Sequence, residues 1–296
     1  MSEAYSRPPG WSTVSAMVPP RDLQLHDGRT LRVHDAGGPD DAFVLVWHHG
    51  SPQTGALLEP LVAAAAARGI RLVSYARPSY GGSSPLPHRT VAAAADDVAQ
   101  LADALGVERF AVMGASGGGP HALACAALLP DRVPGAACLS SPAPYTTDFD
   151  WFAGMVAPGG ARAALEGRDA RARYAETAEF DVESFTPRDW EALERRWAAL
   201  GEDAQRAGTA GPDGFVDDDV AYVTPWGFDV ARIDAPVLLV QGGEDRVIPP
   251  SHAEWLLRAC PRAELWLRPR DGHVSILDAC PLAMDWLLAE ASRPVA

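Results

Sequence analysis

Short apolar segments alternate with helical segments along most of the chain, and this order restricts the possible folds more than any other feature. The apolar runs are continuous, as in strands buried on both faces of a parallel sheet. The stretches between them have helical character, and the one at 90–105 begins with Thr90 as a cap residue. We expect strands at 43–50, 71–76, 108–116 and 133–139, and helices at 55–68, 90–105 and 120–129. This spacing is typical of βαβ units and implies a mostly parallel sheet with helices on both faces.

The alternation is interrupted once, by a long segment that contains no strong strand. Residues 142–228 are charged and aromatic with a helical period, and the clearest helix spans 186–207, where Thr186 can act as the cap. Strands at 236–242 and 263–268 and helices at 251–259 and 276–289 then follow. At the other end of the chain, alternating apolar residues around Asp27-Gly28 predict a β-hairpin. We therefore predict a loose arm over 1–20, an α/β core of 21–141 and 229–296, and a helical insert at 142–228.

Composition excludes several classes of partner and cofactor. The net charge of −14 on 296 residues argues against nucleic acid and anionic membranes as partners. All 25 basic residues are arginine, so Schiff-base chemistry on lysine and a Walker A lysine are excluded. The four cysteines are far apart in the sequence, which makes a metal site an unfavoured interpretation. No segment resembles a signal peptide or is apolar enough to span a bilayer, so we expect a cytoplasmic protein without metal or cofactor that acts on a small molecule.

The stretch GASGGGPHA, residues 114–122, contains the first candidate for chemistry. It matches the pattern G-x-S-x-G, and it lies directly between a predicted strand and a predicted helix. That is the setting of a nucleophile elbow, a sharp turn that exposes a serine hydroxyl above the edge of a sheet. The free N–H groups at the start of the helix point towards the same place. We therefore predict that Ser116 is a nucleophile.

A serine hydroxyl needs a base, and the base needs an acid that orients it. His273 follows a predicted strand and lies at the same sheet edge as Ser116, whereas the other histidines fit the role less well. Asp245 also follows a strand and is the expected acid, although spacing does not exclude the adjacent Glu244. We expect Asp271 to shape the turn before His273.

The order Ser116, Asp245, His273 on such a sheet resembles the α/β-hydrolase family, over about residues 21–290. His49-Gly50-Ser51-Pro52 is similar to the family's H-G-x-P loop. The resemblance implies that the backbone N–H groups of Ser51 and Gly117 form the oxyanion hole, and we expect His49 to be structural.

Residues 77–83 resemble the family's D-R-x-G-Y-G-x-S loop, with Ala76 in place of the usual Asp and Ser79 in place of the first Gly. The resemblance also implies that the insert is a cap over the nucleophile. Trp151 and Trp226 are therefore candidates for substrate binding, while most other aromatic residues of the insert should pack. The run Asp217 to Asp219 is expected to be solvated or to begin a helix, and recognition of a substrate cation is the alternative.

These features predict a serine hydrolase with an α/β-hydrolase fold that cleaves a carboxylic ester or amide through an acyl-enzyme. A proline-iminopeptidase-like aminopeptidase is the main alternative, because acidic residues of the insert could bind a free amine; these are Glu176, Glu179, Glu183 and Asp217 to Asp219. This chain has H-G-S-P-Q, however, where that group usually has H-G-G-P-G. Hydrolysis of a C–C bond, perhydrolysis and a ligand-binding receptor on the same fold also remain open, and the sequence does not indicate the oligomeric state.

Overall fold

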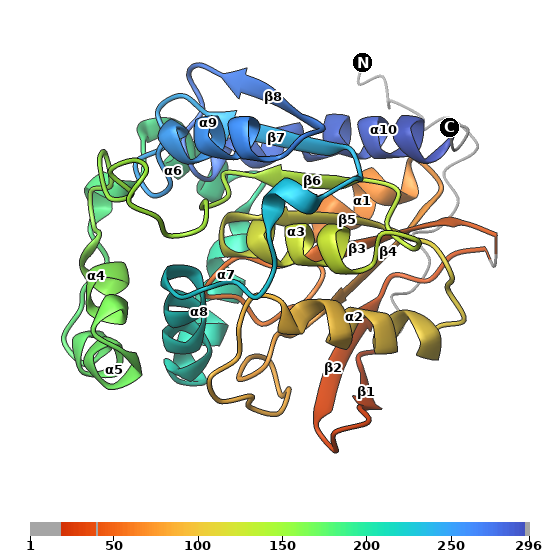
Figure 1. The fold of residues 1–296 in the computed structure, drawn as a ribbon, viewed down its shortest axis with the longest axis horizontal. Coiled ribbons are helices and arrows are strands. Elements are labelled where there is room, and N and C mark those ends of the chain that lie inside the picture. Colours follow the sequence, from red (N-terminus) through yellow and green to blue (C-terminus); the bar gives the residue numbers. More distant parts are fainter. Residues whose placement is uncertain (1–18, 40, 294–296) are drawn as a thin grey trace, which may run out of the picture.

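The computed structural model describes residues 19–39 and 41–293, and its centre is one eight-stranded sheet (Figure 1). The strand order is β1-β2-β4-β3-β5-β6-β7-β8. The two antiparallel pairs are β1 with β2 and β2 with β4, and the remaining pairs are parallel. The strands are β1 (Arg21–Gln24), β2 (Thr30–Asp35), β3 (Phe43–His48), β4 (Ile70–Tyr75), β5 (Ala111–Ala115), β6 (Ala136–Leu139), β7 (Val237–Gly242) and β8 (Ala263–Arg268). The mostly parallel α/β architecture predicted from the sequence is confirmed.

Helices cover both faces of this sheet, because its central strands are apolar on both sides. In β3, Val44 and Val46 face one core, and Leu45 and Trp47 face the other, as the period of two in a strand requires. The first core is completed by α2 (Ala93–Ala104), α3 (Gly119–Leu128) and α9 (Pro250–Ala259). The second is completed by α1 (Glu59–Ala66) and α10 (Cys280–Ala291).

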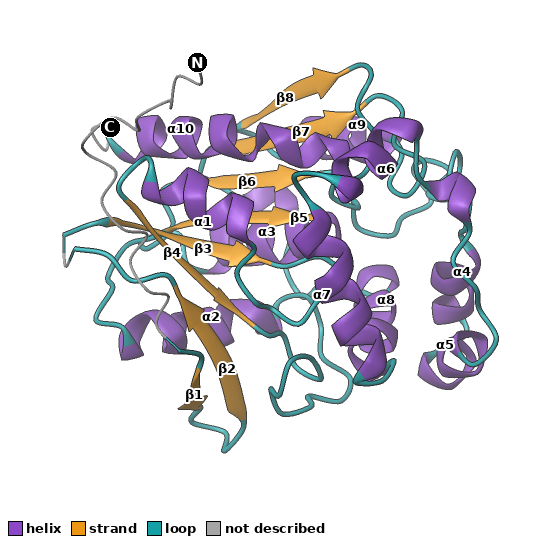
Figure 2. Ribbon diagram, turned by 180° about the vertical axis from the view of Figure 1, so that it is seen from behind, coloured by secondary structure: helices purple, strands orange, loops and turns teal. Residues whose placement is uncertain are grey.

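Five α-helices lie between β6 and β7, within the segment predicted as an insert. They are α4 (Gly159–Leu165), α5 (Arg168–Ala175), α6 (Pro187–Glu194), α7 (Ala198–Thr209) and α8 (Asp213–Val223). Figure 2 shows α6, α7 and α8 beyond the arrowheads of the central strands, at the carboxyl edge of the sheet. The helix predicted at 186–207 is two helices, because the backbone leaves the helical region at Arg195. Thr186 does cap the first, in a capping box with Asp189.

Most other differences from the predicted elements concern their ends. Helix α1 begins at Glu59 rather than at residue 55, and α2 begins at Ala93 without a side-chain cap, so the capping role predicted for Thr90 is wrong. The hairpin around Asp27-Gly28 is confirmed as β1 and β2. The predicted arm lies almost entirely outside the described residues. Within the part of the chain that the structure describes, no helix is long and apolar enough to cross a membrane.

The loop after β3 passes close to the end of β4 at Gly55. A substitution at this position tests whether the two segments approach as closely as the structure shows. The φ of Gly55 is +86°, and a Cβ there would lie 2.5 Å from the backbone N and Cα of Ala76. Gly69 provides a matched control, because its φ of +67° is similar but a Cβ would meet no atom within 4 Å. We expect Gly69→Ala to lower the free energy of unfolding by about 1–2 kcal/mol, the cost of a left-handed residue. Gly55→Ala should cost about 3 kcal/mol or more, because backbone atoms must also move.

Urea denaturation of the two variants beside the unmodified chain measures this difference. Equal losses of stability in the two variants would show that the close approach of Gly55 to β4 does not exist.

Candidate active site

Ser116 occupies a sharp turn between β5 and α3. It opens a short 3₁₀ turn, Ser116–Gly118, and its φ of +51° is in the left-handed region, which is uncommon for any residue but glycine. Neighbouring glycines make the turn possible: a Cβ on Gly114 would collide with the backbone of Gly118, and a Cβ on Gly118 with the carbonyl of His48. Strain of this kind at a half-buried serine is typical of a site of function.

Two side chains from distant loops form a hydrogen-bonded chain with Ser116. The Oγ of Ser116 lies 2.9 Å from Nε2 of His273, and Nδ1 of His273 lies 2.9 Å from Oδ2 of Asp245. The other carboxylate oxygen of Asp245 accepts the backbone N–H groups of Val247 and Ile248, at 2.9 Å each. Because a carboxylate only accepts, Nδ1 carries the proton and Nε2 is free to accept the proton of the Ser116 hydroxyl. The structure brings Asp245 to His273, and not the adjacent Glu244.

The loop that carries His273 is held by a buried carboxylate of the insert, Asp189. Its oxygens accept the N–H groups of Val274 at 2.8 Å and Ser275 at 2.7 Å, and that of His273 at 3.2 Å. Burial lowers the pKa of His273, but the Asp245 carboxylate raises it by more, and Asp189 adds to this, so that the pKa lies above its ordinary value. Asp271, expected to shape the turn, accepts from Arg188 and Arg268.

Ser51 and Gly117 lie side by side next to this chain of residues. A Cβ on Gly117 would collide with the hydroxyls of Ser51 and Tyr222, which shows how closely the two loops approach. His49 is buried and structural: Nδ1–H donates to the carbonyl of Gly50 at 2.7 Å, and Nε2 accepts the backbone N–H of Arg77 at 3.1 Å.

Ser79 occupies the position where the family loop has glycine, and it adopts the corresponding backbone conformation. Its φ is +71°, in the left-handed region that glycine adopts without cost. Its hydroxyl donates to Asp217 at 3.1 Å. Serine at this position therefore adopts a backbone conformation that favours glycine, and its side chain adds a contact with the insert.

The acidic run at 217–219 is not a solvated run, and it does not begin a helix. It lies inside α8, and each carboxylate pairs with arginine side chains of this chain. Asp217 binds Arg168, Asp218 binds Arg77 and Arg89, and Asp219 binds Arg171, at 2.6–2.7 Å. Burial raises the pKa of Asp219 to about 6 in spite of its partner. Three successive helical residues point in different directions, so each meets a different basic side chain.

The two tryptophans predicted to bind substrate are packing residues in this structure. Trp226 belongs to the core beneath α8, and its indole N–H donates to the carbonyl of Tyr222 at 3.1 Å. Trp151 packs against Phe152 and His252, and its N–H donates to the carbonyl of Ala143 at 2.9 Å. Both side chains are buried with their polar atom satisfied, so their contacts are with protein.

Sequence reasoning missed the insert residues that contact the site: Asp189, Asp218 and Tyr222. Asp189 carried a signal, because it stands three residues after Thr186 and completes a capping box. The pattern did not reveal that the same carboxylate binds the His273 loop. No local signal distinguished Asp218 from its two acidic neighbours, or Tyr222 from the other aromatic residues of the insert.

Comparison with known proteins agrees with this fold. A family model described as the alpha/beta hydrolase fold matches residues 44–279. The chain is 29% identical over 262 residues to RutD of Caulobacter sp. (strain K31), to which a carbamate hydrolase activity is ascribed, and the match covers 83% of this chain and 89% of that protein. It is also 29% identical over 201 residues to a pimeloyl-[acyl-carrier protein] methyl ester esterase of Neisseria meningitidis, covering 68% of this chain and 74% of the esterase.

Among solved structures, a hydrolase from Pseudomonas aeruginosa superimposes with a TM-score of 0.70 at 22% identity, over 93% of this chain and 99% of that one. A likeness at this identity concerns the fold. The match to the family, in contrast, extends over most of the sequence, from within β3 to the turn before α10. The protein therefore belongs to the alpha/beta hydrolase family.

Proposed function

We propose that the protein is a serine hydrolase that cleaves carboxylic esters through an acyl-enzyme on Ser116. The observation that carries the proposal is the hydrogen-bonded chain from Ser116 through His273 to Asp245, with 2.9 Å at both steps. The left-handed backbone of Ser116, in the short turn between β5 and α3, is also typical of a nucleophile elbow.

In the first half of the reaction, Ser116 Oγ attacks the ester carbonyl while Nε2 of His273 accepts its proton. The backbone N–H groups of Ser51 and Gly117 stabilise the negative charge on the carbonyl oxygen. Asp245 holds the protonated imidazole in place and offsets its charge. His273 then gives the proton to the leaving alcohol, and the acyl group remains on Ser116.

In the second half, His273 removes a proton from a water molecule, which attacks the acyl carbon. The same two N–H groups stabilise the second tetrahedral intermediate. Its collapse releases the carboxylic acid and returns the proton to Ser116.

The pairing of the acidic run favours an ester over the free-amine substrate of an aminopeptidase. Asp217, Asp218 and Asp219 already face guanidinium groups of this chain and offer an ammonium no unpaired carboxylate. The names of the two sequence relatives, one an esterase and one ascribed to carbamate hydrolysis, support a carbonyl substrate with an oxygen-linked group.

The proposal is tested by labelling with a fluorophosphonate, which reacts with an activated serine. We expect the unmodified protein to be labelled at Ser116 and to hydrolyse p-nitrophenyl esters, with a methyl ester, a carbamate and prolyl-naphthylamide assayed beside them. Ser116→Ala should lose labelling and about 10⁴-fold or more of the ester turnover.

Ser292→Ala is the matched control, because Ser292 is exposed and its hydroxyl donates to the carbonyl of Leu288 in its own helix. It should be labelled and turn over like the unmodified protein. Equal labelling of Ser116→Ala and the unmodified protein would refute Ser116 as the nucleophile, and brisk amide turnover without ester turnover would favour the aminopeptidase.

The dependence of turnover on pH follows from the raised pKa of His273. The imidazole must be neutral to accept the serine proton, so kcat/KM should fall as the pH is lowered. Because the pKa is raised, the midpoint should lie above 6.5, the ordinary value for histidine. Asp245→Asn removes the charge that raises the pKa but leaves the burial that lowers it. The midpoint should therefore move to lower pH, and the rate should fall by up to about 10⁴-fold.

Glu244→Gln separates this role from a general loss of negative charge, since it removes the neighbouring carboxylate. It should leave the pH midpoint unchanged and the rate within about twofold of its original value. A shift in Glu244→Gln that equals the shift in Asp245→Asn would argue against Asp245 as the specific partner of His273.

A further inference from the structure

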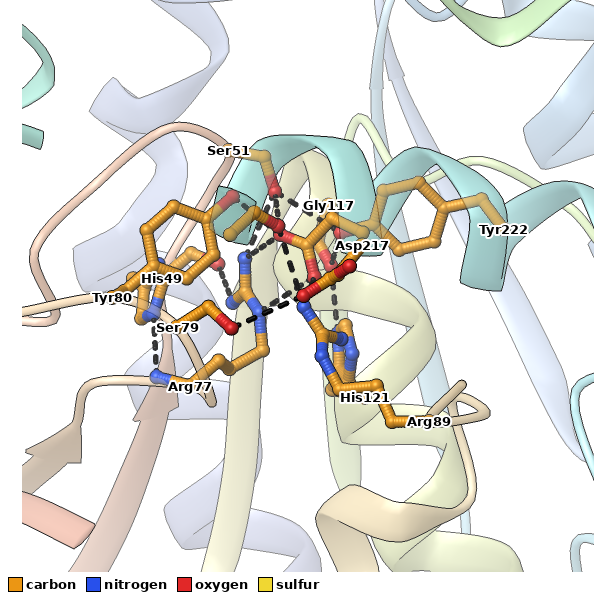
Figure 3. Close-up of polar contacts among 12 residues, drawn as sticks. His49, Ser51, Arg77, Ser79, Tyr80, Arg89, Gly117, His121, Asp217 and Tyr222 are labelled. Carbon is orange, nitrogen blue, oxygen red and sulfur yellow. Dashed lines mark hydrogen bonds and ion pairs between the residues drawn. The ribbon is translucent and has the colours of Figure 1, made fainter. Parts of the chain in front are cut away.

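The two N–H groups proposed for the oxyanion hole belong to different core loops, but one helix of the insert contacts both loops. Figure 3 shows Tyr222 of α8 between Ser51 on one loop and Gly117 on the other. The residues of α8 involved are Asp218 and Tyr222, which lie four positions apart and so on one face of the helix.

On the first loop, the hydroxyl of Ser51 is enclosed by partners. It donates to Oδ2 of Asp218, accepts from Nη2 of Arg77 at 2.9 Å, and lies 3.1 Å from the hydroxyl of Tyr222. Arg77 also donates to the carbonyls of His49 and Gly50. The orientation of the Ser51 backbone is therefore tied to the Arg77–Asp218 pair.

On the second loop, the backbone of Gly117 is held from two sides. Its carbonyl accepts the hydroxyl of Tyr222 at 2.8 Å and Nδ1–H of His121 at 2.8 Å. Burial lowers the pKa of His121 well below its ordinary value, so that it is a neutral donor. A Cβ at position 117 would strike the Tyr222 hydroxyl, so glycine is required there for this contact.

The ion pairs that bring α8 to this place are deeply buried. The side chains of Arg77 and Asp218 are 1% and 0% exposed, and Arg89 pairs with the second oxygen of Asp218 at 2.7 Å. Burial alone would raise the pKa of Asp218, but the two guanidinium groups hold it well below its ordinary value. A charged group at this depth must keep its partners, so these ion pairs hold α8 against the core.

We infer that Asp218 and Tyr222 are positioning residues that align the oxyanion hole, Asp218 through the hydroxyl of Ser51 and Tyr222 through the carbonyl of Gly117. This inference rests on the proposed function and adds to it that the insert completes the catalytic geometry. The inference also assigns a role to the Ser51 hydroxyl, which would orient the backbone, whereas the backbone N–H of Ser51 would contact the substrate.

Ser51→Ala and Tyr222→Phe test the inference, because each removes one hydroxyl and leaves the Arg77–Asp218 pair intact. We expect each to lower kcat for a p-nitrophenyl ester by about tenfold or more, towards the hundred- to thousandfold cost of losing an oxyanion donor. KM should stay within about twofold, since the hole acts on the transition state rather than on the bound ester. The rate of fluorophosphonate labelling should fall in parallel with kcat.

Tyr174→Phe is the matched control, since Tyr174 lies on α5, is 39% exposed and takes no part in the site. It should retain the original kcat, and thermal denaturation should show the three variants folded. A kcat within twofold of the original for both Ser51→Ala and Tyr222→Phe overturns the inference, as does a fall in kcat matched by an equal rise in KM. Failure of the unmodified protein to react with the phosphonate would instead count against Ser116 as the nucleophile.

Discussion

Arg77 and Asp218 are buried in contact with each other, and the geometry around Ser116 depends on this pair. Asp218 also pairs with Arg89, so its loss would leave two buried guanidinium groups without this carboxylate. Breaking a buried pair in this way typically costs about 3–5 kcal/mol. The hydrogen bonds of the Arg77–Asp218 pair extend to the carbonyls of His49 and Gly50 and to the hydroxyl of Ser51. The pair thus connects the loop after β3, the loop after β4 and helix α8 of the insert.

At two other contacts between the insert and the core, a buried carboxylate of the insert also binds a core loop. Asp189 of α6 accepts three N–H groups of the His273 loop, and Asp203 of α7 accepts the N–H and hydroxyl of Thr54. Both carboxylates are buried; Asp189 meets the loop after β8, and Asp203 meets the loop after β3 that Asp218 also contacts. A buried carboxylate that accepts several hydrogen bonds from a loop fixes that loop more specifically than apolar packing does, because each hydrogen bond has a preferred direction. Changes in the insert should therefore alter turnover and not only the choice of substrate.

Several features of the fold and site could be predicted because their causes are local. Continuous apolar runs identified the strands, and the glycines at 114 and 118 identified the elbow. In the structure, neighbouring backbone atoms occupy the space that a Cβ at either position would need. Helix ends were less predictable: α2 begins three residues after Thr90 without its side chain as cap. The break at Arg195 interrupts an otherwise continuous helical pattern, and no glycine or proline beside it predicts the break.

The sequence by itself determined the α/β class, the position of Ser116 on its turn, and the candidates His273 and Asp245, because each depends on residue types at short spacing or at the ends of strands. Only the tertiary structure decided the fate of the acidic run in α8. Asp218 lies 141 residues from Arg77 and 129 from Arg89, and only the folded chain brings these charges together. Whether a carboxylate is solvated, binds a ligand or orients a loop depends on which basic groups surround it, and the residues next to it in the sequence do not show which groups these are.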